Sequence, residues 1–599
     1  MTAPKDRKPD NEWTVMFLFA GDNELAPLMV SQVKAIKDAG YQRKVDVLVH
    51  FDPNEKGVPT RLLHVNRKRK ANPRVPTSVG FGGSGFGHNM QEDAVAPGEI
   101  EGDGEGALKM KEALLNSDKV TALEALSNFV GYGREKHRAK NYALILVGHG
   151  LVVGNDAFLP DEHPASAVTL TMLHEVLKEF TRRVEADGGT FQLLGLHSCA
   201  MSSLEVAYQL RGTARYMIGS EGVSYFNSWP YQTLLMNLFH TVEEADKKAA
   251  AGRPGAYAAA DAREVVENFY FLSLYNARDF MLTGYSQDLA LCSLDPGKYV
   301  PLKEELARLV YRLKGALRGE RGRELILLAH WEAQSYWEEN YTDIYDFCRC
   351  LRARCATALD ALGDDAKSGR TAAELGGLAE ACDAVTRRLG VMSRSEVLDE
   401  RFGRLVVHAD NFGSKYQYSH GLSVYFPWSR PLADDPPPPA PVAPAARSRR
   451  PETPATGILE NYRGYAFTQE FGEDSWLSFL EAYFDRTQRR PRQEEDGAEV
   501  GAAVAVATGA GALAAVAAGA GAGALAADDG GSPLLFNSFG TLVKPTGAYG
   551  PGGVKPTGAY GACSCPTIKN YPTQPVPLDG REVTVKAPFI TEGARRQSQ

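Results

Sequence analysis

The sequence of 599 residues lacks the features that would assign it to a simple class. It has no excess of positive charge, since 66 Lys and Arg stand against 74 Asp and Glu and the net charge is -8. A nucleic-acid binder needs a basic surface, so no nucleic-acid partner is expected. The eight cysteines are scattered rather than spaced as in a small disulfide scaffold, which predicts reduced thiols.

The N-terminus has no hydrophobic run. The first residues, MTAPKDRKPDNEW, include no apolar segment of the kind that a signal peptide needs, which predicts a cytoplasmic protein. One long uncharged run, 500–527, is rich in Ala, Gly and Val and is long enough to span a bilayer. It holds two leucines and no Ile, Phe or Met, so a low-complexity linker is the favoured interpretation and a transmembrane helix is the alternative.

Strand-like and helix-like segments alternate from Trp13 to about His240. Apolar, β-rich runs such as WTVMFLFAGD, VDVLVHFD, YALILVGHG and FQLLGL are separated by segments with apolar residues on one helical face. One of these, from Leu170 to Phe180, has Thr169 at its N-cap position. Continuous apolar strands that alternate with helices predict a mostly parallel sheet flanked by helices.

Changes in composition divide the chain into three parts. The first carries the alternating pattern, the second is largely helical, and the third is a low-complexity tail that contains VKPTGAYG twice. Two copies are too few for a solenoid, so a disordered tail and a docking motif are the two interpretations. The expected bounds are 12–245 with a Gly-rich insertion at 76–108, 246–485 with a Pro-rich loop at 431–456, and 486–599 with the run at 500–527.

Two of the expected strands end in reactive residues. YALILVG runs into His149 and Gly150, and FQLLGL runs into His197, Ser198 and Cys199. The carboxyl ends of parallel strands meet at one edge of a sheet, so His149 and Cys199 are expected to lie together there. The helical pattern after Cys199 places the thiol at a helix N-terminus, where the helix dipole favours a thiolate.

A thiolate beside an imidazole is a nucleophile with its base. Cys199 is therefore the candidate nucleophile and His149 the candidate base, while the N–H groups of Gly150 and Cys199 are candidate donors to an oxyanion. His197 has three interpretations: a second base, a ligand or a pocket-lining residue. Neither His197 nor the other cysteines have neighbours at metal-ligand spacing, so no metal site is expected.

These residues lie in segments through which the chain resembles the clostripain-like (C11) cysteine peptidases, which have a caspase-like fold. The matching segments occur in the family's order between about 12 and 485. They are WTVMFLFAGDNEL, YALILVGHG, CAMSSLEVAYQL, SEGVSYFNSWPY, QDLALCSLD, YTDIYDF, HGLSVYFP and SWLSFLEAYF. The resemblance implies an α/β caspase-like sheet with a helical C-terminal subdomain, and a His149/Cys199 dyad that cleaves peptide bonds through an acyl-enzyme.

The resemblance also implies a zymogen. Family members often mature by cleavage between the two dyad residues, which corresponds here to 151–190. Arg182 and Arg183 are basic candidate sites in that segment, for self-cleavage or for an upstream activating protease.

The family's acidic residues for Arg or Lys at P1 are missing. His197 and Asn227 stand at their positions, so basic specificity is not expected unless Glu221 supplies the negative charge. Some relatives need calcium, which makes calcium the cofactor that the resemblance suggests, although the sequence has no Dx[DN]x[DN]G loop.

The leading hypothesis is a cytoplasmic cysteine endopeptidase that acts on protein or peptide substrates in bacterial stress or antiviral defence. The second is a catalytically silent caspase-fold adaptor that binds partners through its helical half and its tail. The joint presence of His149, Gly150 and Cys199 favours the enzyme, because a silent scaffold has no chemical need for all three. The absence of a QAC[RQG]G signature argues against a caspase proper.

Overall fold

The computed structural model describes most of the chain up to residue 487 and two short strands beyond it. The described ranges are 11–23, 25–53, 60–65, 67, 93–150, 157–250, 259–280, 286–337, 339–362, 369–390, 404–431, 457–487, 576–578 and 581–583. The run at 500–527 and the VKPTGAYG repeats lie outside them. Within these ranges no helix is both long and apolar enough to cross a membrane.

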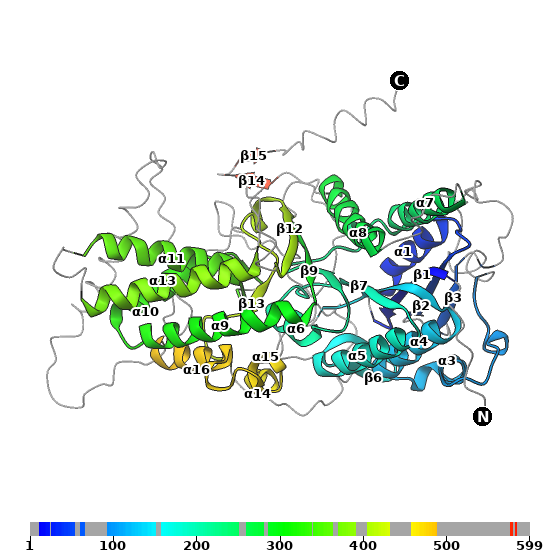
Figure 1. The fold of residues 1–599 in the computed structure, drawn as a ribbon, viewed down its shortest axis with the longest axis horizontal. Helices are drawn as coiled ribbons and strands as arrows, with labels where there is room; N and C mark the ends of the chain where they lie inside the picture. Colours follow the sequence, from blue (N-terminus) through cyan, green and yellow to red (C-terminus); the bar gives the residue numbers. More distant parts are fainter. Residues whose placement is uncertain are drawn as a thin grey trace, which may run out of the picture.

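An eight-stranded sheet forms the centre of the fold (Figure 1). Its strands are β1 (Asn11–Gly21), β2 (Val45–Pro53), β3 (Arg61–His64), β4 (Ala139–Val147), β7 (Thr190–His197), β8 (Tyr216–Gly219), β9 (Gln287–Ser293) and β12 (Val406–Phe412). They are ordered β12-β9-β8-β7-β4-β1-β2-β3. The five strands from β8 to β2 are parallel, and the outer pairs are antiparallel. The predicted mostly parallel sheet is thus confirmed.

Helices cover both faces of this sheet (Figure 1). Along β1, Phe17 and the other odd-numbered core residues belong to one buried cluster, and Met16 and Leu18 belong to another. The first cluster includes α1 (Ala26–Asp38), α7 (Tyr231–Ala250) and α8 (Ala259–Phe280); the second includes α3 (Glu105–Leu115), α4 (Ala122–Lys136), α5 (Leu170–Ala186) and α6 (Leu204–Leu210). A strand buried on both sides has no polar face, which explains the continuous apolar runs in the sequence.

The predicted start of α5 is confirmed. Thr169 is its N-cap, and its hydroxyl oxygen accepts a hydrogen bond from the Met172 N–H at 3.1 Å. In the segment before it, which the sequence did not mark as β-structure, β5 (Phe158–Glu162) and β6 (Ala165–Val168) pair as a hairpin. Of the insertion expected at 76–108, the described part includes a 3-10 turn, η1 (Pro97–Glu99), and the start of α3.

The helical half extends beyond the β9 end of the sheet (Figure 1). It contains α9 (Pro296–Ala316), α10 (Glu320–Glu332), α11 (Ile344–Asp360), α13 (Arg370–Leu389), α14 (Ile458–Arg463), α15 (Ala466–Gln469) and α16 (Trp476–Thr487). A small antiparallel sheet joins β10 (Ser335–Tyr336), β11 (Tyr341–Asp343) and β13 (Ser423–Tyr425), and β14 (Val576–Leu578) pairs with β15 (Arg581–Val583). Because β9 and β12 complete the central sheet, the division expected between 12–245 and 246–485 crosses one continuous sheet.

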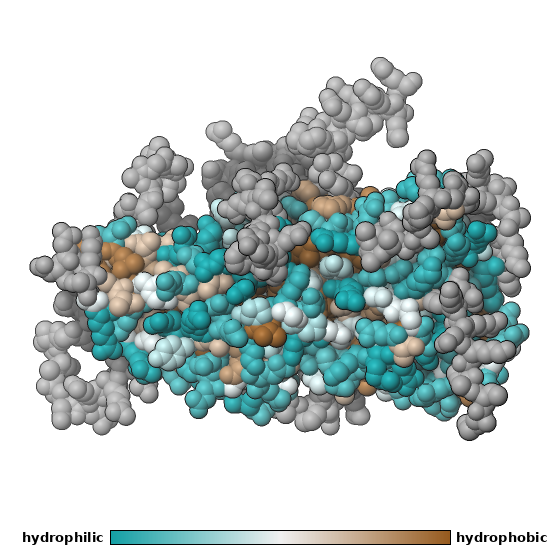
Figure 2. All heavy atoms as spheres, in the orientation of Figure 1, coloured by the Kyte–Doolittle hydropathy of each residue, from teal (hydrophilic) through white to brown (hydrophobic). Residues whose placement is uncertain are grey.

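The surface is that of a globular protein. Figure 2 shows a face on which the described residues are mostly hydrophilic, with small apolar patches between them. Exposed large apolar side chains occur, among them Val300 and Tyr311 of α9. Single exposed side chains of this kind are ordinary in soluble folds.

Candidate active site

His149 and Cys199 follow neighbouring parallel strands at matching positions. Val147, the last residue of β4, pairs with His197, the last residue of β7. His149 and Cys199 each stand two residues beyond that pair, so both leave the sheet at the same edge. Both residues are nearly buried, with exposed fractions of 7% and 1%. The structure therefore brings together the two residues that the sequence singled out.

Gly150 lies directly against the backbone of Cys199. A Cβ atom built on Gly150 would stand 1.7 Å from the carbonyl oxygen of Cys199 and 2.9 Å from its nitrogen. No side chain fits in this space, so glycine is the residue that allows the His149 segment to approach so closely. The backbones of the two candidate oxyanion donors are therefore immediate neighbours.

Cys199 lies in a turn rather than at the start of a helix. α6 begins at Leu204, and its N-cap is Ser203, whose side chain accepts from the Val206 N–H. Ala200, the residue after Cys199, has a φ of 56°, a left-handed conformation that is costly for a residue with a Cβ. The expectation that the helix dipole acts on the thiol is therefore wrong, because this turn separates Cys199 from the helix.

A backbone group donates to the sulfur instead. The N–H of Ser224 donates a hydrogen bond to Sγ of Cys199 at 3.4 Å. An N–H directed at sulfur stabilises a thiolate over a thiol. Sequence reasoning missed Ser224, although SEGVSYFNSWPY was among the matching segments, because a backbone donor leaves no mark on the type of residue.

The turn after Cys199 is held by the distant segment HGLSVYFP. Oγ of Ser202 donates to the carbonyl oxygen of Gly421 at 2.6 Å, and the Ser423 N–H donates to the carbonyl oxygen of Ser202 at 3.1 Å. One turn further, the carboxyl group of Glu205 accepts from the Tyr425 N–H at 2.8 Å. The helical half thus supplies the hydrogen-bond partners of the turn that follows Cys199.

β9 supports the same turn through Asp288. Its carboxylate accepts from the N–H groups of Glu221 and Gly222, at 2.5 and 2.9 Å. The carbonyl oxygen of Gly222 in turn accepts from the Ala200 N–H at 2.9 Å. Burial raises the pKa of Asp288 to about 6, and the two N–H groups act against that shift.

His197 is buried and neutral. Its Nε2 donates to the carbonyl oxygen of Tyr225 at 2.9 Å, and its Nδ1 accepts from the hydroxyl of Tyr231 at 2.5 Å. The ring stacks on Trp229 with 4.9 Å between the centroids. Burial lowers the pKa of His197 to about 4. With both ring nitrogens engaged and only 3% of its side chain exposed, His197 is held as a buried ring, which disfavours each of its three interpretations.

Glu221 supplies no negative charge to a substrate. Its Oε2 accepts from the Gly421 N–H at 2.8 Å and from the Tyr336 hydroxyl at 3.1 Å, and the side chain is fully buried. Burial, followed by the nearby carboxylates of Asp343 and Asp288, raises the pKa of Glu221 well above its ordinary value. The structure does not favour Glu221 as a replacement for the missing family acids, because the carboxyl group is fully buried and Gly421 and Tyr336 both donate to it.

Asn227 is the third pocket candidate. It lies in a 3-10 turn, η3 (Phe226–Ser228), directly after Tyr225, whose carbonyl accepts from His197. Its side chain is outside the described part of the structure.

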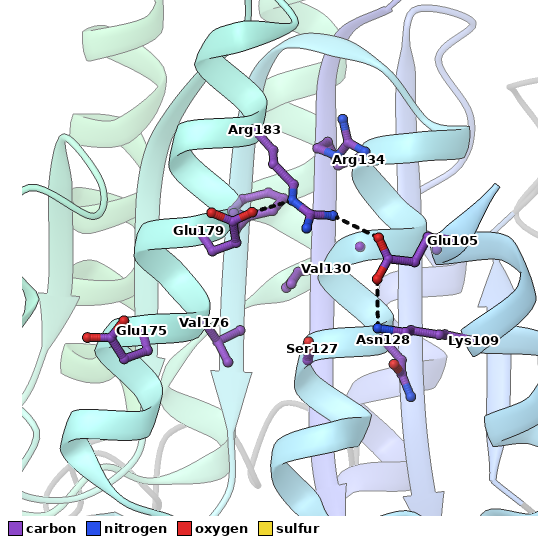
Figure 3. A pocket seen from close by; sticks show the side chains of 13 residues that line it. Glu105, Lys109, Ser127, Asn128, Val130, Arg134, Glu175, Val176, Glu179 and Arg183 are labelled. Atoms are coloured by element: carbon purple, nitrogen blue, oxygen red, sulfur yellow. Dashed lines mark hydrogen bonds and ion pairs between the residues drawn. The ribbon is translucent and has the colours of Figure 1, made fainter.

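Arg182 and Arg183 lie inside α5, not in a loop. Figure 3 shows Arg183 between Glu179 and Glu105, and the guanidinium of Arg182 also pairs with Glu179, at 2.7 Å. A peptidase needs an extended backbone around the scissile bond, whereas helical carbonyls and N–H groups bond one another. Their position within α5 therefore disfavours them as processing sites in the folded protein.

A groove of about 280 Å³ lies beside these arginines, between α3, α4 and α5 (Figure 3). Its lining includes Glu105, Lys109, Arg134, Glu179 and Arg183. Neither His149 nor Cys199 lines it, so this groove is separate from the candidate active site.

One possible metal-binding group occurs within the described ranges. Asp46, His64 and His137 bring one ligand atom each to within 4.8 Å of the others. Sequence reasoning missed this group, because Asp46 is 18 residues from His64 and 91 from His137. Two imidazoles are not ligands that calcium prefers, so calcium stays a prediction from the resemblance.

A thiol and an imidazole at the carboxyl edge of a parallel sheet define the class of α/β cysteine hydrolases. Comparison with protein-family models agrees. Residues 19–364, more than half of the chain, match the model described as Peptidase_C11, the clostripain family. The protein belongs to this family and is a cysteine peptidase, with protein or peptide substrates. No curated protein matches the sequence.

Several solved structures are similar to this chain. One is a secreted C11 cysteine protease from Bacteroides thetaiotaomicron in complex with an irreversible peptide inhibitor. Its sequence is 16% identical, the alignment covers 79% of this chain and 99% of that chain, and the TM-score is 0.40. Another is an inactive zymogen C11 protease from Parabacteroides distasonis, with 17% identity, coverage of 70% and 92%, and a TM-score of 0.35.

Proposed function

We propose that Cys199 and His149 form the catalytic dyad of this cysteine peptidase. The observation that carries the proposal is the register of β4 and β7, which sets both residues two positions beyond the Val147–His197 pair. The close contact of Gly150 with Cys199 and the hydrogen bond from the Ser224 N–H to the sulfur support it.

In the proposed mechanism, His149 takes the proton of the Cys199 thiol, and the thiolate attacks the carbonyl carbon of the scissile peptide bond. The N–H groups of Gly150 and Cys199 stabilise the negative charge on the carbonyl oxygen. His149 then protonates the leaving amine as the C–N bond breaks, which leaves a thioester on Cys199. A water molecule that gives its proton to His149 hydrolyses the thioester and restores the thiol.

A thiol-reactive peptide probe tests the dyad. We expect one label per wild-type chain, none on Cys199→Ala and slow labelling of His149→Ala. Cys350→Ala, which removes another buried cysteine, on α11, is the matched control and should be labelled like the wild type. Labelling of Cys199→Ala at the wild-type rate would exclude Cys199 as the nucleophile. A wild type that is neither labelled nor active after cleavage within 151–190 would favour the silent adaptor.

We propose that the enzyme does not select Arg or Lys at P1. The neutral, buried His197 and the buried Glu221 support this proposal, because neither presents a negative charge to a basic side chain. Cleavage of a peptide library that varies P1, with and without calcium, tests both the specificity and the cofactor. Preferential cleavage after Arg and Lys would contradict the proposed specificity.

We propose that the enzyme is a zymogen activated by cleavage within 151–190.

We also propose that the enzyme acts in the cytoplasm. The six cysteines of the described ranges are buried thiols, which supports a reducing compartment. Fractionation of the native host tests the location, and recovery of the enzyme from the medium would contradict it. A role in stress or antiviral defence stays a prediction, tested by comparing phage survival in hosts with wild-type enzyme and with Cys199→Ala.

A further inference from the structure

Three polar side chains meet at the edge of the sheet opposite to the dyad. Asp46 lies near the start of β2, His64 ends β3, and His137 is the C-cap of α4 just before β4. Since β2 and β4 both run parallel to β1, this is the edge where these strands begin, whereas His149 and Cys199 lie beyond the strand ends. The group is therefore separate from the catalytic chemistry.

The two imidazoles each direct one nitrogen at the same carboxylate. Nε2 of His64 is 3.1 Å from Oδ1 of Asp46, and Nδ1 of His137 is 2.8 Å from Oδ2. The two rings are nearly perpendicular, with an interplanar angle of 79° and 4.7 Å between their centroids. One ligand atom from each of the three residues thus lies within 4.8 Å of the other two.

The spacing of these atoms is close to that of ligands around zinc. With bonds of about 2.0 to 2.1 Å, the ligand atoms of a tetrahedral zinc site stand roughly 3.3 Å apart. The distances from the two imidazole nitrogens to the carboxylate, 3.1 Å to Oδ1 and 2.8 Å to Oδ2, are near this value, and one ligand atom from each residue lies within 4.8 Å of the others.

Neighbouring groups orient the ligands. Nδ2 of Asn11 donates to Oδ2 of Asp46 at 2.7 Å, and the hydroxyl of Thr14 donates to the carbonyl oxygen of His137 at 2.7 Å. Outer hydrogen bonds of this kind fix the geometry of metal ligands. The side chains of Asp46 and His64 are 21% and 23% exposed, so both reach solvent.

We propose that Asp46, His64 and His137 bind a zinc-class divalent ion. Two nitrogens and one carboxylate oxygen suit Zn²⁺ or Co²⁺, whereas Ca²⁺ and Mg²⁺ prefer oxygen ligands alone. On binding, each neutral ring carries its proton on the nitrogen that faces away from the ion. The ion joins β2, β3 and the junction of α4 with β4, and so fastens the edge strand of the sheet.

Metal titration of the full-length Cys199→Ala protein tests the site, because that background removes the catalytic thiol as a ligand. After treatment with a chelator, we expect one Zn²⁺ per chain by calorimetry, a higher Tm with Zn²⁺, and visible absorption bands of tetrahedral Co²⁺. Introducing His64→Ala or Asp46→Asn into the Cys199→Ala protein should weaken Zn²⁺ binding by at least about 10-fold and remove the Co²⁺ bands.

Two controls keep the outcome decisive. His240→Ala removes an exposed imidazole on α7 and should bind both ions like its parent. Asp46→Asn keeps the shape of the side chain, and circular dichroism checks that both ligand variants are folded. The proposal would be overturned if the parent and the folded ligand variants bound Zn²⁺ with equal affinity, or if the parent did not bind it. The three residues would then form only a hydrogen-bonded group.

Discussion

The α-carbon of Gly150 faces the carbonyl oxygen of Cys199 across a space too small for a methyl group. The nucleophile and its candidate base are thus brought together by contact between two main chains. Side chains around the site can change without separating these backbones, whereas one added carbon atom at Gly150 cannot be accommodated.

Gly150→Ala should therefore lower kcat/KM by about 100-fold, because a displacement of about 1 Å in a catalytic group has an effect of that order. The assay is hydrolysis of the best peptide from the library. Gly376→Ala is the control, since a Cβ there meets nothing within 4 Å and the residue lies in α13. Activity of Gly150→Ala within twofold of the wild type would show that the close contact has no catalytic role.

Ser202→Ala should destabilise the protein by about 1 to 3 kcal/mol, because it leaves the buried carbonyl of Gly421 without its 2.6 Å hydrogen bond from Oγ. We also expect lower kcat, since Ser202 holds the turn that carries Cys199. Urea unfolding and peptide hydrolysis measure the two effects. Ser127→Ala, at an exposed position on α4, should change neither, and equal unfolding curves for both variants would contradict the prediction.

Replacing His197 should change how stability depends on pH. The pKa of His197 is about 4 in the fold against 6.5 ordinarily, so between these values the unfolded chain binds a proton that the folded protein does not. The contribution of His197 to unfolding free energy is fully present above pH 6.5 and falls by about 3 kcal/mol as pH drops to 4.

His197→Gln should lack this fall, because the amide can donate to Tyr225 and accept from Tyr231 without titrating. Unfolding free energies of both proteins at pH 7, 5.5 and 4 provide the measurement. His240→Gln controls for the loss of an exposed imidazole. A constant difference between the wild type and His197→Gln across this range would refute the buried, neutral state of His197.

Restoring the family's acid with His197→Asp should not produce cleavage after Arg or Lys. The site around His197 is closed, and the carbonyl of Tyr225, which now accepts a hydrogen bond, would face a carboxylate oxygen. We therefore expect lower stability at neutral pH and an unchanged P1 profile. A gain of basic specificity in the peptide library would show that position 197 can reach substrate.

Processing of the chain should not occur at Arg182 or Arg183 while α5 is folded. Intact mass and N-terminal sequencing of matured protein identify the cleavage site. Arg182→Ala and Arg183→Ala should mature at the wild-type rate, and loss of maturation in either variant would mean that α5 opens before cleavage.

Much of the sheet, and the approach of His149 to Cys199, could be predicted because both rest on local patterns. Apolar runs mark β1, β4 and β7, and the register of adjacent parallel strands makes His149 and Cys199 neighbours. The hairpin of β5 and β6 was missed, because its Pro and acidic residues obscure the alternation. The start of α6 was misplaced, because the side chains after Cys199 suit a helix while Ala200 adopts a positive φ.

The surroundings of the site depend on contacts between distant residues. Nothing near His197 in the sequence indicates that its ring stacks on Trp229 and bonds to the Tyr231 hydroxyl. The sequence likewise does not show that the carboxyl group of Glu221 is buried and accepts from the Gly421 N–H. The Asp46, His64 and His137 group likewise exists only after four elements have assembled around it. Contacts of this kind can be identified only from the three-dimensional structure.

The hydrogen bond between Ser202 and Gly421 joins residues that are 219 positions apart. During synthesis the nucleophile therefore leaves the ribosome long before β13 (Ser423–Tyr425) can hold its turn. A nascent chain that has reached only α7 has Cys199 and His149 but neither β9 nor β13 beside them. Because β13 supports the turn after Cys199, we expect the nascent chain to lack peptidase activity until translation has passed Tyr425.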